Sequence, residues 1–370
     1  MRNITQSTCC VIPPHIQNHV AQHGNSKQRE RAAATLAHTV AQRSCEQAAA
    51  LIGPRVQRPL EKKRHIYHAG GQLTLPGTLV MTEERTTASD IEMREAFDGS
   101  GAVYDFLGSV FLRHSIDNRG MRLDSTVHYG THFENAFWNG RQMVYGDGDG
   151  QLYNRFTAPV DVVAHEHIHG MTEHDAGLLY CGQPGALNEH ISDVIGILTK
   201  QWRLGLTAMR SDWVIGREVF GPAVRGVGLR SMKAPGTAYD DPVLGKDPQP
   251  SHMRRYMDFP DDDGGVHINS GILNRAFYFT AADLRGYAWE IGGRIWYRTA
   301  TSRLHPEADF QYFAEATVTV AGEMYGIGGN VQRVIFDAFS RVGLSLPASL
   351  LRSAGFGRKA LLPEGSSAKE

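Results

Sequence analysis

Residues 160–174 read VDVVAHEHIHGMTEH and contain the pattern His-Glu-x-x-His. His165 and His169 are four positions apart, so on a helix both imidazoles leave the same face about 6 Å from each other, close enough to share one Zn²⁺. Glu166 lies beside that face, where it could take a proton from a water that the metal activates. His167 points to another face, and we interpret it as structural. The stretch predicts a metal site for hydrolysis on a helix.

A third zinc ligand is expected downstream, because two histidines leave a tetrahedral zinc site short of one protein ligand. Residues 185–193 read GALNEHISD, and Glu189 there stands at the start of an apolar-periodic helix. Asp193 lies one turn further on the same face, where it could hold a ligand histidine by its second ring nitrogen. Taken alone, Glu189 would be a first-turn carboxylate that the helix dipole favours. The histidine motif, expected by chance roughly 0.04 times in such a chain, favours the ligand interpretation.

Composition excludes several classes of protein. The 370 residues allow two domains and a shorter extra segment. Lys plus Arg number 38 against 39 for Asp plus Glu, so the net charge of −1 gives no reason to expect a nucleic-acid or membrane partner. No run of eighteen apolar residues is present, and the apolar patch near the N-terminus is too short for a signal-peptide core. We expect export without a conventional signal peptide, or retention in the cytoplasm.

The chain divides into regions of different pattern. Residues 1–55 are rich in Gln, Arg and Ala, with a helix expected over 27–52, and 53–64 resemble an exposed linker. Short β-type runs follow, including 72–80 and 125–129, with one helix predicted over 102–113. Helices then dominate, predicted over 160–174, 188–204, 270–285, 287–301, 309–324 and 330–342. This order predicts an α+β protein with two lobes. We divide it into a β-rich lobe (56–172), a helical lobe (173–346) and a tail (347–370).

Together, HExxH and GALNEHISD resemble the thermolysin-like family of zinc endopeptidases, whose third ligand is the Glu of a GAxNExxSD segment. The similarity extends from about His65 to Val342, through NAFWNGRQMVYGDGDG (135–150), LRSM (229–232) and GGVHINSGILNRAFY (264–278). The resemblance implies a β-rich N-terminal lobe, a helical C-terminal lobe and the zinc site in the cleft between them. It also implies hydrolysis of peptide bonds on the N-terminal side of hydrophobic residues.

The resemblance assigns roles to individual residues of this chain. It makes His165, His169 and Glu189 the zinc ligands and Glu166 the general base. His267 matches the histidine that stabilises the oxyanion, Asp262 the carboxylate that orients it, and Tyr180 an assisting hydroxyl. The resemblance further implies that substrate backbone pairs with a strand edge at Asn135 and Ala136, and that Arg230 binds a substrate carbonyl. Apolar residues fall where the family lines its main specificity pocket, with Tyr153 beside them: Phe156, Val162, Ile215, Val219 and Leu229.

Departures from the family pattern concern calcium. Lys200, Val214 and Arg217 stand where better-known members carry acids of a double calcium site, and Val227 replaces an acid of another site. Cations cannot ligate Ca²⁺, so we expect Lys200 and Arg217 to form ion pairs with Asp161 or Asp212 instead. Calcium could still bind at Asp147 and Asp149, although that loop has its own interpretation as a Gly-rich turn.

The N-terminus matches a subgroup. Residues 9–16, CCVIPPHI, resemble the short propeptide of protealysin-like members, so residues 1–55 are expected to inhibit the enzyme or assist its folding. A thiolate of Cys9 or Cys10 could reach the zinc, or both could pack under the Pro-Pro turn. We expect a monomeric zymogen that acts on peptides or proteins. The alternatives are an inactive or propeptide-locked peptide-binding protein on the same fold, and a zinc hydrolase for another substrate.

Overall fold

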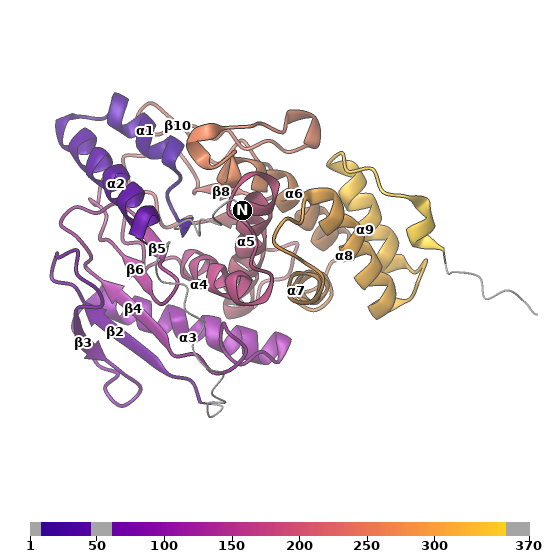
Figure 1. Cartoon of the computed structure of the whole chain (residues 1–370), viewed down its shortest axis with the longest axis horizontal. Coiled ribbons are helices and arrows are strands. Elements are labelled where there is room, and N and C mark those ends of the chain that lie inside the picture. Colours follow the sequence, from indigo (N-terminus) through magenta and orange to yellow (C-terminus); the bar gives the residue numbers. More distant parts are fainter. Residues whose placement is uncertain (1–8, 46–60, 353–370) are drawn as a thin grey trace, which may run out of the picture.

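A six-stranded sheet, in the order β1-β5-β6-β4-β2-β3, forms one side of the molecule (Figure 1). The computed structural model describes residues 9–45 and 61–352, with side chains for 10–39 and 61–352. Neighbours β2–β4 and β4–β6 are parallel, and the other neighbouring pairs are antiparallel. The strands are β1 (Cys9–Cys10), β2 (Arg64–His68), β3 (Thr78–Met81), β4 (Leu123–Val127), β5 (Ala136–Trp138) and β6 (Met143–Tyr145).

Helix α3 (Ile91–Phe111) makes the crossover that two parallel strands such as β2 and β4 require. The Asp90 side chain caps it by accepting the Met93 backbone N–H at 3.0 Å. The helix begins at the Asp90 cap, earlier than the prediction of 102–113, and its Gly99 and Gly101 leave room for the side chains of Val163 and Arg64. A Cβ at Gly101 would lie 2.3 Å from Nη1 of Arg64, so only glycine leaves room for that guanidinium.

Arg64 itself corrects the sequence analysis, which placed it at the end of an exposed linker. It lies in β2, is buried, and pairs with Glu83 at 2.7 Å while its guanidinium covers the Phe97 ring. The remainder of that predicted linker up to residue 60 lies outside the described residues. The paired and stacked guanidinium explains how a charged residue can start a buried strand.

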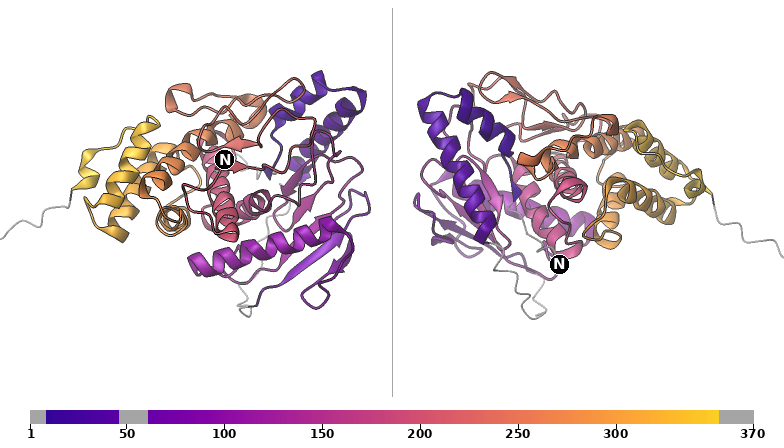
Figure 2. Two further views of the ribbon diagram at one scale, coloured as in Figure 1. Left: turned by 180° about the vertical axis from the view of Figure 1, so that it is seen from behind. Right: turned by 45° about the horizontal axis from the view of Figure 1, so that its top comes forward.

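The C-terminal half is helical, as predicted, and the fold is α+β. Helices α4, α5 and α6 form the centre of the molecule, and α7 to α9 extend it on the side away from the sheet (Figures 1 and 2). Four predicted helices match to within four residues at both ends, whereas α7 begins five residues after the predicted 287 and α5 begins six residues before Asn188. The helices are α4 (Val160–Asp175), α5 (Gly182–Leu204), α6 (Val266–Leu284), α7 (Gly292–Ser302), α8 (Phe310–Tyr325) and α9 (Asn330–Arg341).

Short elements connect these helices. Two ribbons pair β7 (Val214–Ile215) with β8 (Arg230–Ser231) and β9 (Asp240–Asp241) with β10 (Gly245–Lys246). Single turns of 3₁₀ helix occur at η2 (Met253–Arg255), η3 (Pro260–Asp262) and η4 (Ala348–Leu351). None of the helices within the described ranges combines the length and apolar character that a membrane-crossing helix needs. Most of the predicted tail, from residue 353, lies outside the described part.

Two N-terminal helices, α1 (Pro14–His23) and α2 (Ser26–Cys45), lie against the β5 and β6 side of the sheet (Figure 1). Helix α2 confirms the predicted helix as far as Cys45, and residues 46–52 lie outside the described ranges. The sequence analysis did not include α1. Pro13 is extended and precedes Pro14 at the first helical position, where a missing N–H costs nothing.

Candidate active site

The proposed zinc ligands come from two central helices that pack closely. Helix α4 carries His165 and His169, and α5 carries Glu189. Gly196 allows the helices to approach, because a Cβ there would lie 2.6 Å from the Asp161 carbonyl oxygen. Glu189 lies in the second turn of α5, not at its start, so the interpretation as a first-turn dipole carboxylate is wrong.

The three ligand side chains converge on one point. Nε2 of His165 and Nε2 of His169 are 3.0 Å apart, and the Glu189 carboxylate oxygens lie 3.3 Å from the first and 3.4 Å from the second. Zinc bonds of 2.0–2.1 Å in a tetrahedron separate ligand atoms by about 3.3 Å. The buried donor set therefore fits a zinc ion in both chemistry and spacing.

A side-chain oxygen lies next to Nδ1 of each histidine. These contacts determine that Nε2 faces the point where the proposed ligand atoms converge. Asp193 Oδ1 lies 2.9 Å from Nδ1 of His165, the contact that the sequence predicted for a ligand histidine. Asn188 Oδ1 lies 2.9 Å from Nδ1 of His169. The Nδ1 of each ring thus lies 2.9 Å from an oxygen, which leaves Nε2 for the metal. The sequence analysis assigned no role to Asn188, although it is the Asn of the GAxNExxSD pattern and stands one residue before Glu189.

Glu166 lies beside the ligand point and is held at the edge of the sheet. Its Oε2 accepts the backbone N–H of Trp138 in β5 at 3.1 Å, while its buried Oε1 has no hydrogen-bond partner in the described part of the chain. Glu166 also offers an oxygen within 4.8 Å of the ligand atoms of His165 and His169. Glu189 contacts both rings directly, so the geometry favours Glu189 as the ligand. Burial raises the pKa of Glu166 to about 8.

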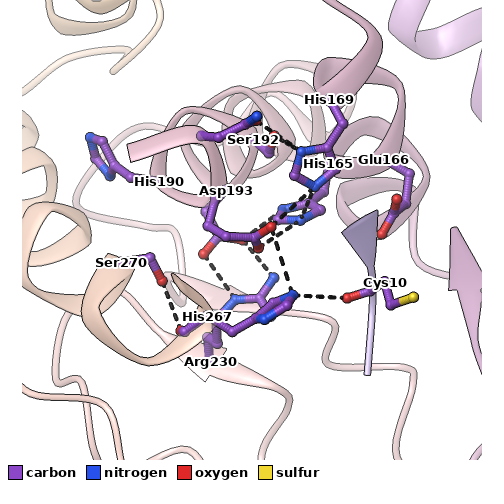
Figure 3. A network of polar contacts seen from close by, with 12 residues as sticks. Cys10, His165, Glu166, His169, His190, Ser192, Asp193, Arg230, His267 and Ser270 are labelled. Carbon is purple, nitrogen blue, oxygen red and sulfur yellow. Dashed lines mark hydrogen bonds and ion pairs between the residues drawn. The ribbon is translucent and has the colours of Figure 1, made fainter. Parts of the chain in front are cut away.

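His267, at the start of α6, faces the same point from the other side (Figure 3). Its Nδ1 lies 2.5 Å from Asp262 Oδ1, and its Nε2 lies 3.2 Å from the Tyr180 hydroxyl. Tyr180 also donates to Glu189. Burial disfavours the imidazolium, but the carboxylates of Glu189 and Asp262 outweigh that effect and raise the pKa of His267 to about 9. The predicted donors for an oxyanion are thus brought together.

Arg230 makes a contact that the sequence analysis did not predict. Its Nε and Nη2 donate to the Asp193 carboxylate at 2.9 and 2.7 Å, and Asn274 donates to the same carboxylate at 2.8 Å. Burial opposes ionisation of Asp193, but Arg230 and His165 outweigh it and lower its pKa. Nη1 of Arg230 is buried and has no partner among the described residues, so it remains available for a substrate carbonyl.

The predicted apolar pocket residues are all buried, as is Tyr153, and belong to one continuous apolar cluster. Gly216 packs closely against two of these side chains. A Cβ at this position would lie 2.8 Å from Leu229 and 3.3 Å from Val162. The predicted pocket residues within this large core are Phe156, Val162, Ile215, Val219 and Leu229. An apolar wall thus extends from α4 to β7 and β8.

Comparison with known proteins identifies the family. Residues 54–173 match the family described as thermolysin metallopeptidase, catalytic domain, and residues 176–344 match its α-helical domain. The chain belongs to the thermolysin family of metallopeptidases. It is therefore a metalloendopeptidase, and its fold is thermolysin-like.

Relatives of the thermolysin family cover nearly the whole chain. An extracellular metalloprotease of Pectobacterium carotovorum is 45% identical over 93% of this chain and 98% of its own length. Protease PrtS of Photorhabdus is 41% identical over 91% of this chain and 92% of its own. The precursor of protealysin from Serratia proteamaculans has a similar structure, with a TM-score of 0.83 and 45% identity over 91% of this chain and all of that chain.

The N-terminal segment of this thermolysin-family chain reaches the zinc-ligand region. Strand β1 pairs antiparallel with β5, with Cys10 opposite Phe137, and the Cys10 carbonyl oxygen lies 3.1 Å from Nε2 of His267. The Cys10 thiol points away from the histidines (Figure 3), and its residue packs in a cluster with Phe137 and Val144. A Cys10 thiolate ligand is therefore wrong, and the backbone carbonyl makes the contact instead. The side chain of Cys9 lies outside the described residues.

Contacts beyond β1 attach the same segment to the thermolysin-like part. Gln17 donates to the Glu134 carbonyl at 3.0 Å, and Arg31 pairs with the Glu134 carboxylate at 3.4 Å. His15 Nε2 lies 3.0 Å from the Tyr239 hydroxyl, and His19 Nδ1 lies 2.8 Å from the Val243 carbonyl oxygen. The segment thus contacts both the sheet region and the connection that follows β8.

The departures at the family's calcium positions form the predicted ion pairs. Lys200 Nζ lies 3.3 Å from Asp161 and 3.7 Å from Asp212, and Arg217 lies 2.7 Å from Asp212. In the GDGDG turn, Asp147 pairs with His128 at 2.9 Å. Asp149 accepts three backbone N–H groups, those of Gln151, Leu152 and Tyr153. These carboxylates already have protein partners, which fits the interpretation of the loop as a turn.

Proposed function

We propose that this chain is the zymogen of a zinc endopeptidase that cuts before hydrophobic residues, with His165, His169 and Glu189 holding the metal. The main support for this proposal is the spacing of 3.0 to 3.4 Å between the atoms that would bind the metal. The Glu166 carboxylate lies beside them, and its Oε1 has no hydrogen-bond partner among the described residues. When bound, zinc supplies a Lewis acid that polarises the peptide carbonyl and lowers the pKa of water. The remaining chemistry belongs to side chains of this protein.

Glu166 is the general base in this proposal. Its Oε2 is fixed by the Trp138 N–H, which leaves Oε1 to take a proton from the attacking water and deliver it to the leaving amine. Burial disfavours the carboxylate, which raises the pKa of Glu166 and favours uptake of the water proton. Asp193 and Asn188 hold the ligand rings in one tautomer.

His267 and Tyr180 would donate to the oxygen that becomes negative in the tetrahedral intermediate. Asp262 positions His267 and favours its protonated form. Asn135 and Ala136 would bind substrate backbone, and Arg230 would offer Nη1 to a substrate carbonyl. Burial of a Leu or Phe side chain against the apolar wall would contribute about 1.5 to 3 kcal/mol, which supports a hydrophobic preference after the cut bond.

Residues 1–55 would act as an intramolecular inhibitor, with 56–172 and 173–346 as the two lobes of the enzyme. The Cys10 carbonyl at His267 and strand β1 along β5 support this role, because both would exclude a substrate. A peptide-binding protein without activity would not need Glu166 and His267 beside a ligand set. The name of one relative, the extracellular metalloprotease of Pectobacterium carotovorum, supports export of the enzyme.

We expect that His267→Ala lowers kcat on a furylacryloyl dipeptide amide by about 10²- to 10³-fold with little change in KM, because the donor acts on charge in the transition state. Zinc content should stay at one per chain. His305→Ala, on an exposed surface, is the matched control and should leave kcat unchanged. An unchanged kcat in His267→Ala removes that residue from the mechanism. A wild type without zinc or hydrolysis after removal of the prosegment contradicts the function itself.

His15 should make prosegment docking depend on pH. Burial is the main cause that lowers the pKa of His15 to about 4; Asp262 opposes this shift, while His267, Arg230 and His19 contribute to it. The ring of a released prosegment titrates near the ordinary histidine pKa of 6.5, so docking is fully favoured above pH 6.5 and weakens as pH falls towards 4. Between pH 7.5 and 5 we expect docking to weaken about 10- to 30-fold.

Hydrogen exchange of the full-length Glu166→Gln chain measures this effect without enzymatic activity. After correction for intrinsic exchange, protection of the Val11 and Ile12 amides should fall at pH 5, while that of amides in α9 stays constant. His15→Gln keeps a partner for Tyr239 but does not titrate, so its protection should be flat over this range. An equal loss of protection in His15→Gln would assign the pH dependence to another group.

A further inference from the structure

One peptide bond of the N-terminal segment faces the catalytic groups. The carbonyl oxygen of Cys10 is 3.1 Å from Nε2 of His267, whose Nε2 is in turn 3.7 Å from Glu189 Oε1 (Figure 3). The next residue, Val11, donates its N–H to the Ala136 carbonyl at 3.0 Å. The Cys10–Val11 amide therefore lies between His267, the proposed oxyanion donor, and the edge of β5.

The residues on either side fix this register. Ile12 makes two hydrogen bonds with one side chain, donating to Asn135 Oδ1 at 2.8 Å and accepting from Asn135 Nδ2 at 3.1 Å. On the other side, Cys9 lies opposite Trp138, whose N–H holds the Glu166 carboxylate. A slip by one residue would break the paired bonds to Asn135 and reverse the side chains. The proposed base thus lies at the same end of β5 as Cys9.

The side chains agree with this register. Val11 and Ile12 are each 1% exposed, and both belong to the main hydrophobic core of the protein. Val11 is the residue directly after the presented bond, where the proposed specificity expects an apolar side chain. Pro13 then has no N–H to continue strand pairing, and the chain turns into α1.

We infer that the prosegment occupies the site in the register of a substrate, and that the released enzyme hydrolyses the bond between Cys10 and Val11. The inference rests on the proposed function. The oxygen of one water joins the carbonyl carbon of Cys10, the C–N bond breaks, and the amine of Val11 gains the hydrogen. The cut therefore leaves a new carboxyl terminus at residue 10 and a new amino terminus at residue 11.

The contacts of α1 and α2 explain why such a segment can still inhibit. They lie wholly on the Val11 side of the bond, through His15, Gln17, His19 and Arg31. A cut after Cys10 leaves all of these contacts intact, so the larger product stays docked. A short peptide that lacks α2 has few of them and should instead turn over as a substrate.

The test uses the peptide TQSTCCVIPPHIQ, residues 5–17, with zinc-loaded enzyme obtained by processing of the full chain. Mass spectrometry should show products that end at Cys10 and begin at Val11. A second peptide with Cys9→Ala and Cys10→Ala should be cut at the same bond, which excludes thiol binding to the metal as the cause of recognition. In that background, Val11→Asp should slow cleavage at least 10-fold, whereas Thr5→Asp, six residues from the bond, should leave the rate unchanged.

A furylacryloyl dipeptide amide, assayed in parallel, separates the two hypotheses. If the enzyme hydrolyses the amide but leaves the peptide intact, or cuts it at another bond, the register is wrong and the proposed function stands. If neither is hydrolysed, the proposed function fails and the inference fails with it. Cleavage at Cys10–Val11 that is insensitive to Val11→Asp would overturn the placement of the Val11 side chain in an apolar site, since a buried apolar position must reject a carboxylate.

Discussion

The variant Glu166→Gln is expected to bind one zinc per chain and to lose peptide hydrolysis by about 10³- to 10⁴-fold. The amide can still accept the Trp138 N–H at the sheet edge, so the local structure should persist. It cannot take up the proton that Oε1 of the carboxylate would receive. Zinc content by elemental analysis and kcat/KM on a furylacryloyl dipeptide amide measure the two effects separately.

Glu173→Gln is the matched control for this variant. It makes the same carboxyl-to-amide change on the same helix, where Glu173 accepts the Trp138 side-chain N–H at 3.1 Å. Its activity should stay within about twofold of the wild type. Intact mass then reports processing: if the full-length Glu166→Gln chain still loses its prosegment, another protease performs that cut. Full hydrolytic activity of Glu166→Gln would rule out Glu166 as the base.

The variant His169→Ala should lose the zinc and nearly all activity. It removes one of the three proposed zinc ligands and leaves Asn188 facing a void in place of the ring. We expect less than about 0.1 zinc per chain after gel filtration and at least a 10³-fold lower kcat/KM. Loss of a ligand that binds only the native state should also lower the Tm of the zinc-treated protein.

His174→Ala is the control for this second variant. His174 lies on an exposed position in the last turn of the same helix, outside the ligand set. It should retain one zinc per chain and wild-type activity. A His169→Ala protein that keeps stoichiometric zinc would mean that the metal binds elsewhere. Chelation of the wild type followed by zinc addition should restore hydrolysis, whereas the same treatment should leave His169→Ala inactive.

Local sequence patterns predicted the helices and the histidine pair because their information is contained within one or two turns. His165 and His169 need only helical spacing to share a face, and the structure places their Nε2 atoms 3.0 Å apart. The prediction for Glu189 depended on the resemblance, since nothing local separates a ligand from a carboxylate near a helix start. Its true position inside α5 removed the competing interpretation.

The contacts of Cys10, Arg64 and Asn188 could not be predicted from the sequence, because they depend on backbone atoms or on residues that are neighbours only in the folded chain. The contact of Cys10 with His267 uses a carbonyl oxygen, which every residue type has, so attention to the thiol was misplaced. Arg64 was assigned to a linker because charge normally indicates exposure, whereas Glu83 and Phe97 enclose it. Asn188 holds His169 only because α5 packs against α4.

Strand β1 has a further consequence for the protein as a molecule in solution. It is the terminal strand of the sheet on the side of β5, so its removal leaves the N–H and C=O groups of β5 as a bare edge. Bare edges pair readily with other chains and are a recognised cause of aggregation. While the segment is in place, it covers this edge and would therefore suppress self-association at high concentration. After activation, a substrate peptide could pair with β5 in place of β1. The solubility of the enzyme and its resistance to self-digestion would then depend on how often such a peptide occupies this edge.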